Sequence, residues 1–362
     1  MNITIGFIGL GLIGGSIAKS LKKADTSIQI IAYNRSKQPL IKAHEEGIVD
    51  EIAYEIDDTF NKCDVIILCT PVEYISMYLS KISEFINENC IITDVGSVKG
   101  YIHKTVSELH LDKNFIGGHP MAGSEKTGYD ASSDILLQNA YYAITPTPES
   151  GQESIDLLVS LVRLTGAIPI VCNPDIHDYA VAGISHVPHL IASGLVNMVH
   201  DNDTDDCLMK TLAAGGFKDI TRIASSSAEV WSQICYTNKE QISLVLGKYI
   251  NYLVAVKDMI DSENKEGIFK MFSDSKEFRD SIGINNGPII RNYTLYCDIE
   301  DKEGALSNIT LLLSDNHISI KNIEIIHNRE YSDGVLQISF YDELSRTSAR
   351  NILSEKGYFI HR

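Results

Sequence analysis

Three glycines near the N-terminus stand at the spacing of a turn that binds diphosphates. Gly9, Gly11 and Gly14 form the pattern G-x-G-x-x-G, after a short apolar run and before a helical pattern of apolar residues. The first glycine allows a sharp turn, the second lets a pyrophosphate approach the backbone, and the third lets the helix pack closely on the strand. The helix, which begins with Leu12 and Ile13, directs free N–H groups at the diphosphate. This stretch predicts a dinucleotide-binding site.

Polar groups stand at the ends of three further predicted strands. Thr70, Ser97 and His119 each end or follow a continuous apolar run, which is typical of a parallel strand buried on both faces. Ligands of open parallel sheets bind beyond the carboxyl ends of the strands, so we expect these three residues, and Pro71, near the nicotinamide. The runs are residues 64–70, 90–95 and 115–121, and two later strands, 140–145 and 167–171, are expected to finish the sheet.

The residues expected beside the adenosine ribose leave the choice of cofactor open. A site specific for NAD usually places Asp or Glu after the second strand, which we expect at residues 28–34. This chain has Asn34, Arg35 and Ser36 there instead. No carboxylate would repel a 2′-phosphate, and Arg35 could pair with one, although it could equally be a solvated loop residue. The sequence therefore makes NADP plausible beside NAD.

Composition narrows the class of protein. The 362 residues suffice for two or three domains, and the net charge of −17 argues against a nucleic-acid or anionic-membrane partner. No run reaches the roughly 18 continuous apolar residues of a membrane span, and the N-terminus lacks a basic leader region. The seven cysteines include no C-x-x-C pair, so we expect a reducing cytoplasm and no zinc site. Three histidines, at positions 177, 186 and 189, lack a carboxylate or cysteine at ligand spacing, so we expect no metal.

The hydrophobic pattern divides the chain into residues 1–172, an all-helical region 173–284, and a C-terminal region 285–362. A long helix is predicted over 175–202, with Ser185 and His189 on one face and a bend at Pro188, which has no N–H to donate. Gly215-Gly216 is expected to break the following helix, before Lys218 and Arg222. Two further helices are predicted over 228–262 and 264–281. The amphipathic helices favour a homodimer core.

Alternation with a period of two begins after the Asn285–Pro288 linker. The predicted order is β-α-β-β-α-β, the ferredoxin-like arrangement. The isoleucines of ISIKNIEII change parity, which predicts a bulge near Lys321-Asn322, and Ser332-Asp333-Gly334 predicts a hairpin turn. The expected fold class is thus α/β: a Rossmann-type domain, a helical domain and a small α+β domain.

Several longer motifs resemble the prephenate dehydrogenases of tyrosine biosynthesis, in the bacterial form with a C-terminal ACT domain. The resemblance extends over essentially the whole chain, and the middle motifs are far more specific than the glycine pattern. The motifs are GLGLIGGS at 9–16, TDVGSVK at 93–99, GGHPMAGSEKTG at 117–128, SHVPH at 185–189, AAGGFKDITRIA at 213–224, and DKEGALSNIT with SIKNIEI in the C-terminal region.

The resemblance implies the reaction and most of the site. Prephenate loses hydride from its carbinol carbon to NAD(P)+ and carbon dioxide from the opposite ring position, while a base takes the hydroxyl proton. By resemblance His119 is that base, Ser97 orients it, and Arg222 binds a carboxylate through its planar fork. His189, with Ser185, supplies further polar contacts, and Trp231 either walls the pocket or belongs to the helical core. Glu125, Lys218 and Asp178 resemble an ionic network at the entrance, or are simply surface charges.

Four questions stay open at this level. Arogenate carries an ammonium where prephenate has a keto group, and Glu125 could favour it. A β-hydroxy-acid dehydrogenase, with a Lys base on its helical domain, and a non-enzymatic redox sensor are alternatives that the histidine motifs disfavour. The ACT-like segment suggests L-tyrosine as a feedback inhibitor, held near Asp301–Gly304 and Asn322. Tyrosine could instead compete at the active site, and the segment could be a dimerisation module without a ligand.

Overall fold

The computed structural model describes residues 2–123, 126–282, 293–300, 302–326 and 334–361. It contains two compact units, Met1–Leu253 and Val254–Arg362. Each unit is described by itself below.

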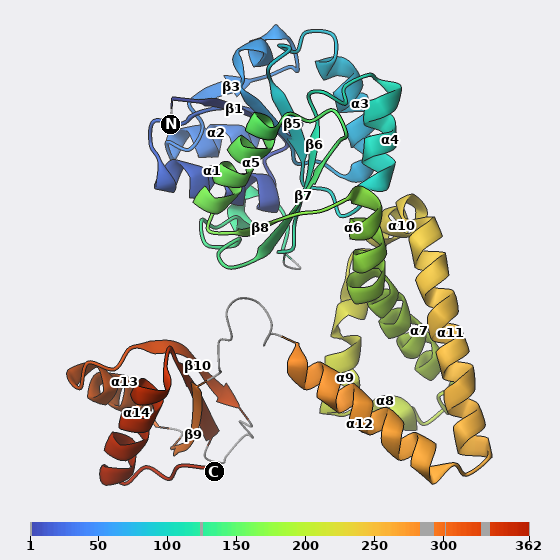
Figure 1. The fold of residues 1–362 in the computed structure, drawn as a ribbon, viewed down its shortest axis with the longest axis vertical. Coiled ribbons are helices and arrows are strands. Elements are labelled where there is room, and N and C mark those ends of the chain that lie inside the picture. Colours follow the sequence, from blue (N-terminus) through green and yellow to red (C-terminus); the bar gives the residue numbers. More distant parts are fainter. Residues whose placement is uncertain (1, 124–125, 283–292, 301, 327–333, 362) are drawn as a thin grey trace. The chain divides into compact units, whose positions relative to one another are not determined.

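The first unit begins with a five-stranded parallel sheet (Figure 1). Its strand order is β3-β2-β1-β4-β5, so β1 and the dinucleotide turn lie at its centre. This order places the carboxyl ends of β1, β4 and β5 beside one another at one edge, as the sequence predicts. The strands are β1 (Thr4–Ile8), β2 (Gln29–Tyr33), β3 (Glu51–Ala53), β4 (Val65–Leu68) and β5 (Ile91–Asp94).

The later strands form a second sheet instead of completing the first, which corrects the prediction. β6 (Ile116–Pro120) pairs antiparallel with β7 (Tyr141–Pro146), and β7 pairs parallel with β8 (Ile168–Val171). A parallel pairing needs a crossover connection, which α5 (Gln152–Leu164) supplies between β7 and β8. The described part of the β6–β7 connection holds only a short 3-10 turn, and a single parallel bridge between Ile92 and Phe115 joins the two sheets.

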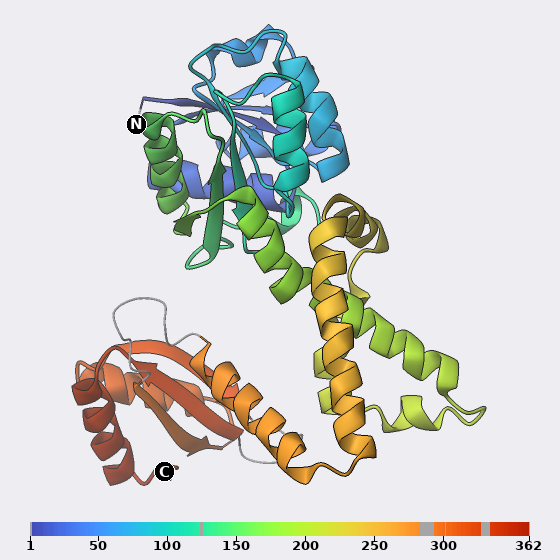
Figure 2. The ribbon, with the colours of Figure 1, turned by 45° about the vertical axis from the view of Figure 1, so that its right-hand side comes forward.

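Helices cover both faces of the parallel sheet. α1 (Leu12–Ala24), α2 (Lys37–Glu45) and α5 share one apolar core, which includes the buried Leu21 and Leu161. α3 (Val72–Ile82) and α4 (Gly100–Glu108) share the other, with Leu79 and Ile102. Figures 1 and 2 show α3 and α4 side by side on the face away from α1 and α5. Burial on both faces explains why these strands read as continuous apolar runs.

The long predicted helix is interrupted near Pro188, as expected. A π-helical turn over Ala182–His186 separates α6 (Pro174–Val181) from α7 (Val187–Asn202). Proline cannot donate to the carbonyl of Ile184, and the wider turn accommodates the loss. The remaining helical elements are α8 (Leu208–Leu212), α9 (Gly215–Thr221), a 3-10 turn at Arg222–Ser225, α10 (Ala228–Thr237), α11 (Lys239–Asp261) and, in the second unit, α12 (Lys265–Ser281).

Two predicted helix boundaries are wrong. Gly215 begins α9 instead of breaking a helix, and the break lies at Ala213–Ala214. The helix expected over 228–262 is two helices, because Asn238 ends α10. The buried side-chain amide of Asn238 donates to the carbonyl of Asp178 (3.0 Å) and lies 3.1 Å from Nδ1 of His186. These contacts reach far along the chain, so local propensity did not reveal them.

The second unit ends in an antiparallel sheet of order β10-β11-β9, with α13 (Ala305–Asp315) and α14 (Glu343–Glu355) packed on it. Its strands are β9 (Tyr293–Ile299), β10 (Ile320–Ile326) and β11 (Gly334–Phe340). Ile360 adds an antiparallel bridge to Cys297 on the free side of β9. The register shifts between Ile320 and Asn322, so the predicted bulge is confirmed. Ser332 and Asp333 of the predicted hairpin turn lie outside the described residues.

Candidate active site

A cavity of about 550 Å³ in the first unit brings together residues from four parts of the sequence. Ser97 follows β5, His119 lies on β6, and the remaining walls come from the π turn, α7 and residues 223–234. Five residues singled out from the sequence line this cavity: Ser97, His119, Ser185, His189 and Trp231. A small apolar core, in which Val98 packs with Ala182, Val187 and Ile234, holds the β5 loop against the helices.

A buried ion pair fixes the loop that carries Ser97. Lys99 and Asp94 are both fully buried, and the ammonium of Lys99 donates to the carboxylate of Asp94 and to the carbonyl of Gly118 (2.6 Å). Asp94 also accepts from the N–H groups of Gly96 (2.7 Å) and Gly118 (3.1 Å). Gly118 must lack a side chain, because a Cβ there would lie 2.5 Å from the carbonyl oxygen of Asp94. These bonds tie the end of β5 to β6, and so hold Ser97 and His119 at one edge.

His119 heads a chain of three polar side chains. Its Nδ1 lies 2.9 Å from Nε2 of His177, and Nδ1 of His177 lies 2.8 Å from Oδ1 of Asp178. Asp178 also accepts from the backbone N–H groups of Lys99 (2.8 Å) and Gly100 (2.7 Å), at the start of α4. Asp178 was expected at the entrance; instead it is 4% exposed, beneath His177. It belongs to the interior, and no entrance network can include it.

His119 is a neutral imidazole at neutral pH. Burial lowers its pKa well below the ordinary value, and the positive charge of Lys99 lowers it further. Neighbouring His177 and His186 act in the same direction. A neutral ring has a lone pair to accept a proton, so the geometry suits a general base.

The opposite wall is built around Trp231, the sole tryptophan. The rings of Trp231 and His189 are stacked, with centroids 3.5 Å apart, and His186 meets Trp231 edge-on. Nδ1–H of His189 donates to the carbonyl of Ser185 (2.9 Å), so the four-residue spacing does place the two residues together. Trp231 therefore lines the cavity and also packs against buried side chains, which combines the two alternatives left open by the sequence.

Two other predicted substrate-binding residues are not part of the cavity wall. Arg222 is exposed, but it lies near His189: burial lowers the pKa of His189, and the charge of Arg222 lowers it further. Lys218 is exposed on α9 and does not line the cavity. Glu125 lies outside the described residues.

The glycine turn has the shape that a dinucleotide requires. Gly9 has φ +99°, and a Cβ on it would lie 2.5 Å from the carbonyl oxygen of Cys69. A Cβ on Gly14 would collide with the carbonyl of Gly9, whereas one on Gly11 would meet nothing within 4 Å. Open space therefore lies against the backbone where a diphosphate would approach. Leu12 and Ile13 open α1 behind it.

The residues around this turn also fit a cofactor. Oδ1 of Asn34 accepts from the N–H of Leu10 (2.9 Å), and its amide donates to the carbonyl of Ser36 (3.0 Å), so Asn34 braces the turn. Arg35 and Ser36 are exposed beyond it. The hydroxyl of Thr70 is buried without a hydrogen-bond partner, just before Pro71 caps α3. A buried polar group without a partner is a natural contact for a bound ligand.

Sequence reasoning missed the residues behind the cavity wall. Asp94, Lys99 and Asn238 were given no role, and His177 was considered only as a metal ligand. Within the described residues, no group of three or more His, Cys, Asp or Glu side chains is arranged to hold a metal ion. The one available signal was the adjacent pair His177-Asp178 on the helix after the last strand, because such a pair can brace another histidine.

Comparison with known proteins agrees with this architecture. Residues 17–171 match the family model described as "Prephenate dehydrogenase, nucleotide-binding domain", and residues 173–274 match "Prephenate dehydrogenase, dimerization domain". Prephenate dehydrogenase from Bacillus subtilis is 35% identical over 99% of this chain and 98% of its own length.

Two solved structures share the fold of the first two regions. Prephenate dehydrogenase from A. aeolicus, in complex with hydroxyphenyl propionate and NAD+, is 31% identical with a TM-score of 0.73, and the match covers 77% of this chain and 98% of that one. Synechocystis arogenate dehydrogenase is 30% identical with a TM-score of 0.71, over 77% and 100%. The chain thus has a Rossmann-type nucleotide-binding domain and a helical domain, and it belongs to the prephenate dehydrogenase family.

Proposed function

We propose that this protein catalyses the oxidative decarboxylation of prephenate to 4-hydroxyphenylpyruvate, with hydride transfer to NAD(P)+, as a step of L-tyrosine biosynthesis. The observation that carries the proposal is the neutral, half-buried imidazole of His119 in a cavity beside the dinucleotide edge of the sheet. Family membership supports the substrate and argues against a β-hydroxy-acid dehydrogenase or a non-enzymatic sensor.

In this reaction His119 takes the proton of the ring hydroxyl at its Nε2 atom. Ser97, on the same cavity wall, donates to or accepts from that hydroxyl and keeps it aligned with the imidazole. When bound, the nicotinamide cofactor supplies the acceptor for the hydride that leaves the carbinol carbon. Loss of carbon dioxide then makes the ring aromatic, which drives the step forward, and the resulting phenolate oxygen regains a proton to give 4-hydroxyphenylpyruvate.

The two substrate carboxylates need cationic or strong donor groups in a chain of net charge −17. Arg222 is the proposed anchor for one of them, because its guanidinium forms two parallel bonds to a carboxylate and it lies near His189. His189 and Ser185 supply further polar contacts, and Trp231 covers the ring. Glu125 and Lys218 are proposed at the entrance, with a weaker role because Lys218 does not line the cavity.

The cofactor is held by the glycine turn, with Thr70 and Pro71 beside it. NAD is the first choice, and the A. aeolicus relative was solved with NAD+ bound. Arg35 is exposed next to the turn and no carboxylate stands at positions 34–36, so NADP is a plausible second cofactor.

The test is to mix the protein with prephenate and each cofactor and to follow the absorbance of the reduced nicotinamide. We expect reduction with prephenate, accompanied by one 4-hydroxyphenylpyruvate per cofactor. Arogenate in place of prephenate separates the two family substrates. No reduction with either substrate and either cofactor would reject the proposal.

The helical region, proposed as residues 173–284, supports a homodimer. The span Pro174–Asn202 is long and apolar enough to cross a membrane by composition alone, yet only 28% of its most apolar window is buried. Ile184, Leu212 and Ile220 are each at least 60% exposed. A second copy of the chain would cover this surface, in keeping with the family description of a dimerization domain. Sedimentation at micromolar concentration tests the dimer.

We propose a cytoplasmic location because none of the seven cysteines, all described, forms a disulfide.

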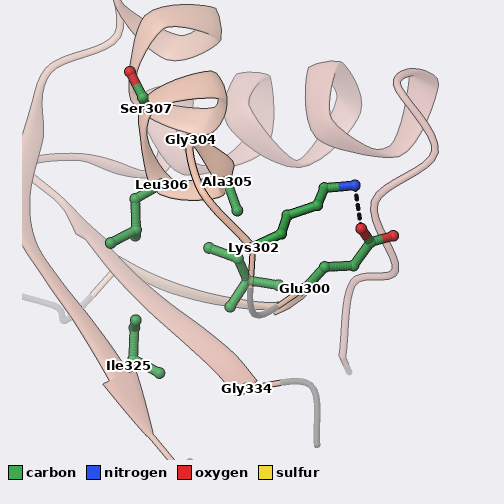
Figure 3. Close-up of a pocket in the computed structure, with 9 residues that line it drawn as sticks. Glu300, Lys302, Gly304, Ala305, Leu306, Ser307, Ile325 and Gly334 are labelled. Carbon is green, nitrogen blue, oxygen red and sulfur yellow. Dashed lines mark ion pairs between the residues drawn. The ribbon is translucent and has the colours of Figure 1, made fainter.

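The C-terminal region, residues 285–362, is proposed to be an ACT domain that binds L-tyrosine as a feedback inhibitor, and the antiparallel sheet β10-β11-β9 in its described part supports this. A cavity of about 340 Å³ lies between the start of α13 and the ends of β9 and β10 (Figure 3). Gly304, predicted from the sequence, lines it, and Glu300 and Lys302 form an ion pair at its rim. Asn322 does not line this cavity, and Asp301 lies outside the described residues.

Filling this cavity tests the proposed regulation. Ser307→Phe should raise the tyrosine concentration needed for half inhibition at least several-fold without changing the KM for prephenate, and deleting residues 288–362 should abolish the inhibition. Unchanged inhibition in both variants would place tyrosine at the active site instead.

A further inference from the structure

The hydrogen bonds behind His119 determine where its protons lie. A carboxylate only accepts hydrogen bonds, so Nδ1 of His177, 2.8 Å from Oδ1 of Asp178, carries the proton of that ring. With that proton on Nδ1, the lone pair of the His177 ring lies on Nε2, which faces Nδ1 of His119 at 2.9 Å. Nδ1 of His119 must therefore donate. The lone pair of the neutral His119 ring is thereby placed on Nε2, the atom proposed to receive the substrate proton.

The Asp178 carboxylate is held by hydrogen bonds at the far end of this chain. Its two oxygens accept from the backbone N–H groups of Lys99 and Gly100 and from Nδ1–H of His177. Its backbone carbonyl is held separately by the amide of Asn238. Asp178 is thus positioned by residues of α4, α6 and the α10–α11 junction. None of the residues that make these contacts lines the cavity.

The surrounding charges favour movement of a proton from His119 toward His177. A proton on His119 lies close to the buried ammonium of Lys99, which disfavours it, whereas a proton on His177 lies against the carboxylate of Asp178. Further titratable groups lie around this site: Asp94 and His103 near Lys99, and His186 near both His119 and His177.

We propose that Asp178 and His177 are positioning residues for His119: they select its tautomer, and His177 accepts its Nδ1 proton as the substrate proton arrives at Nε2. The inference rests on the proposed function for the identity of the proton donor. In the step, the hydroxyl O–H bond breaks as the Nε2–H bond forms. The Nδ1–H bond of His119 breaks as an Nε2–H bond forms on His177. One proton enters the pair, and the positive charge comes to rest beside Asp178.

Asp178→Asn is the sharpest variant. Oδ1 of Asp178 accepts from His177 and from the N–H of Lys99, whereas Oδ2 accepts from the N–H of Gly100, so a neutral amide cannot keep all three bonds. The variant removes the negative charge that favours a proton on His177, and an amide NH₂ in the Oδ1 position would also reverse both tautomers and place the proton of His119 on Nε2. We expect kcat to fall about 10²- to 10⁴-fold with little change in KM, the size of effect known for a carboxylate that orients a catalytic histidine.

His177→Gln separates orientation from proton acceptance. The glutamine amide reaches the position of Nε2, so its oxygen can still accept from Nδ1–H of His119, but it cannot take the proton. We expect kcat to fall about 10- to 100-fold, the value of one hydrogen bond to a charged group. The acid limb of the kcat/KM profile should move to lower pH in both variants, because a proton on the base is no longer stabilised through His177 by the carboxylate of Asp178. A purely structural defect would lower activity without moving that limb.

The matched control is His103→Gln. His103 is also a half-buried histidine near Lys99, but its Nε2 bonds to the hydroxyl of Thr145 (3.0 Å), outside the chain of three. We expect its kcat and acid limb to stay within about twofold of the unchanged protein. An equally large loss in this variant would overturn the inference, since the effect would belong to packing.

Nitrogen NMR of the unchanged protein, labelled in histidine, tests the tautomers without any activity or variant. We expect Nδ1–H on His119 and on His177. An Nε2–H tautomer on His119, or kcat within about twofold of normal in Asp178→Asn, would overturn the inference. If the predicted tautomers appear but no prephenate is turned over, the proposed function fails and the hydrogen-bonded chain still stands.

Discussion

The two sides of the cavity are built in opposite ways. On the side of His119, charged and polar groups are buried and paired: Lys99 and Asp94 have no exposed surface, and His177 and Asp178 are each 4% exposed. On the side of Arg222, the residues are exposed, and Ile220 keeps 60% of its surface open. The groups of the proposed proton transfer are therefore arranged within one chain before any ligand arrives. The proposed anion site lies on a surface that a second copy of the chain would complete.

The largest expected effect comes from the buried side. His119→Asn removes the base while an amide keeps part of the hydrogen bonding to His177. We expect kcat to fall by about 10² or more, with little change in KM, because the interaction matters most in the transition state. Steady-state kinetics with prephenate measures both constants. A near-normal kcat would end the proposed role of the imidazole.

The exposed side should respond through binding. Arg222→Gln removes the guanidinium that we propose binds one of the two substrate carboxylates. We therefore expect kcat/KM to fall about 10- to 100-fold, mostly through a higher KM. The matched control is Lys218→Met, which removes a charge from the same helical segment but not from the cavity region; we expect less than about a threefold change. Equal losses in both variants would mean that kcat/KM depends only on the total positive charge of this segment, and not on a specific contact of Arg222.

Acid should destabilise the buried side first. Burial lowers the pKa of His103 and His119, and that of His186 to about 4. Unfolded histidines titrate near pH 6.5, so below about that pH the unfolded chain binds more protons and the free energy of unfolding falls as pH falls. Urea unfolding followed by Trp231 fluorescence should show a lower midpoint at about pH 5 than at about pH 7.5.

His186→Gln should reduce this pH difference, because it removes one of the histidines that stay neutral in the folded state. His44→Gln, which changes a partly buried histidine on α2 far along the sequence, serves as the comparison variant. An unchanged midpoint between the two pH values in the unmodified protein would contradict the burial of neutral histidines.

The smallest effect is expected at the outer edge of the dinucleotide site. Arg35→Ala should lower kcat/KM with NADP+ several-fold and leave that with NAD+ within about twofold, if Arg35 pairs with the 2′-phosphate. The ratio of the two values measures the preference. A strong NAD preference that persists unchanged in the variant would remove NADP from the account.

The sequence predicted well those features that depend on local chemistry. The spacing of Gly9, Gly11 and Gly14 and the continuous apolar runs determined the first sheet, and Ser97 and His119 were placed at its edge because parallel strands end together. The bulge near Asn322 followed from a change of parity within one strand. Each of these features depends on the types and spacing of about ten neighbouring residues.

Features that depend on distant partners were not predicted. His119 meets His177 across 58 positions, and Asn238 ends α10 through contacts 52 and 60 positions away. β7 runs antiparallel to β6, and the described part of their connection holds only a short 3-10 turn, which the hydrophobic pattern did not reveal. Asp178 was misplaced because a carboxylate in a polar-looking helix gives no local sign that it is buried beneath a histidine.

A crystal structure of the protein with NAD+ and a non-reacting prephenate analogue would test the central claim most directly. We predict that Nε2 of His119 lies about 3 Å from the hydroxyl oxygen of the analogue, with Nδ1 still bonded to His177. An analogue bound in this cavity with its hydroxyl turned away from His119, or a His119 ring rotated out of contact with His177, would contradict it.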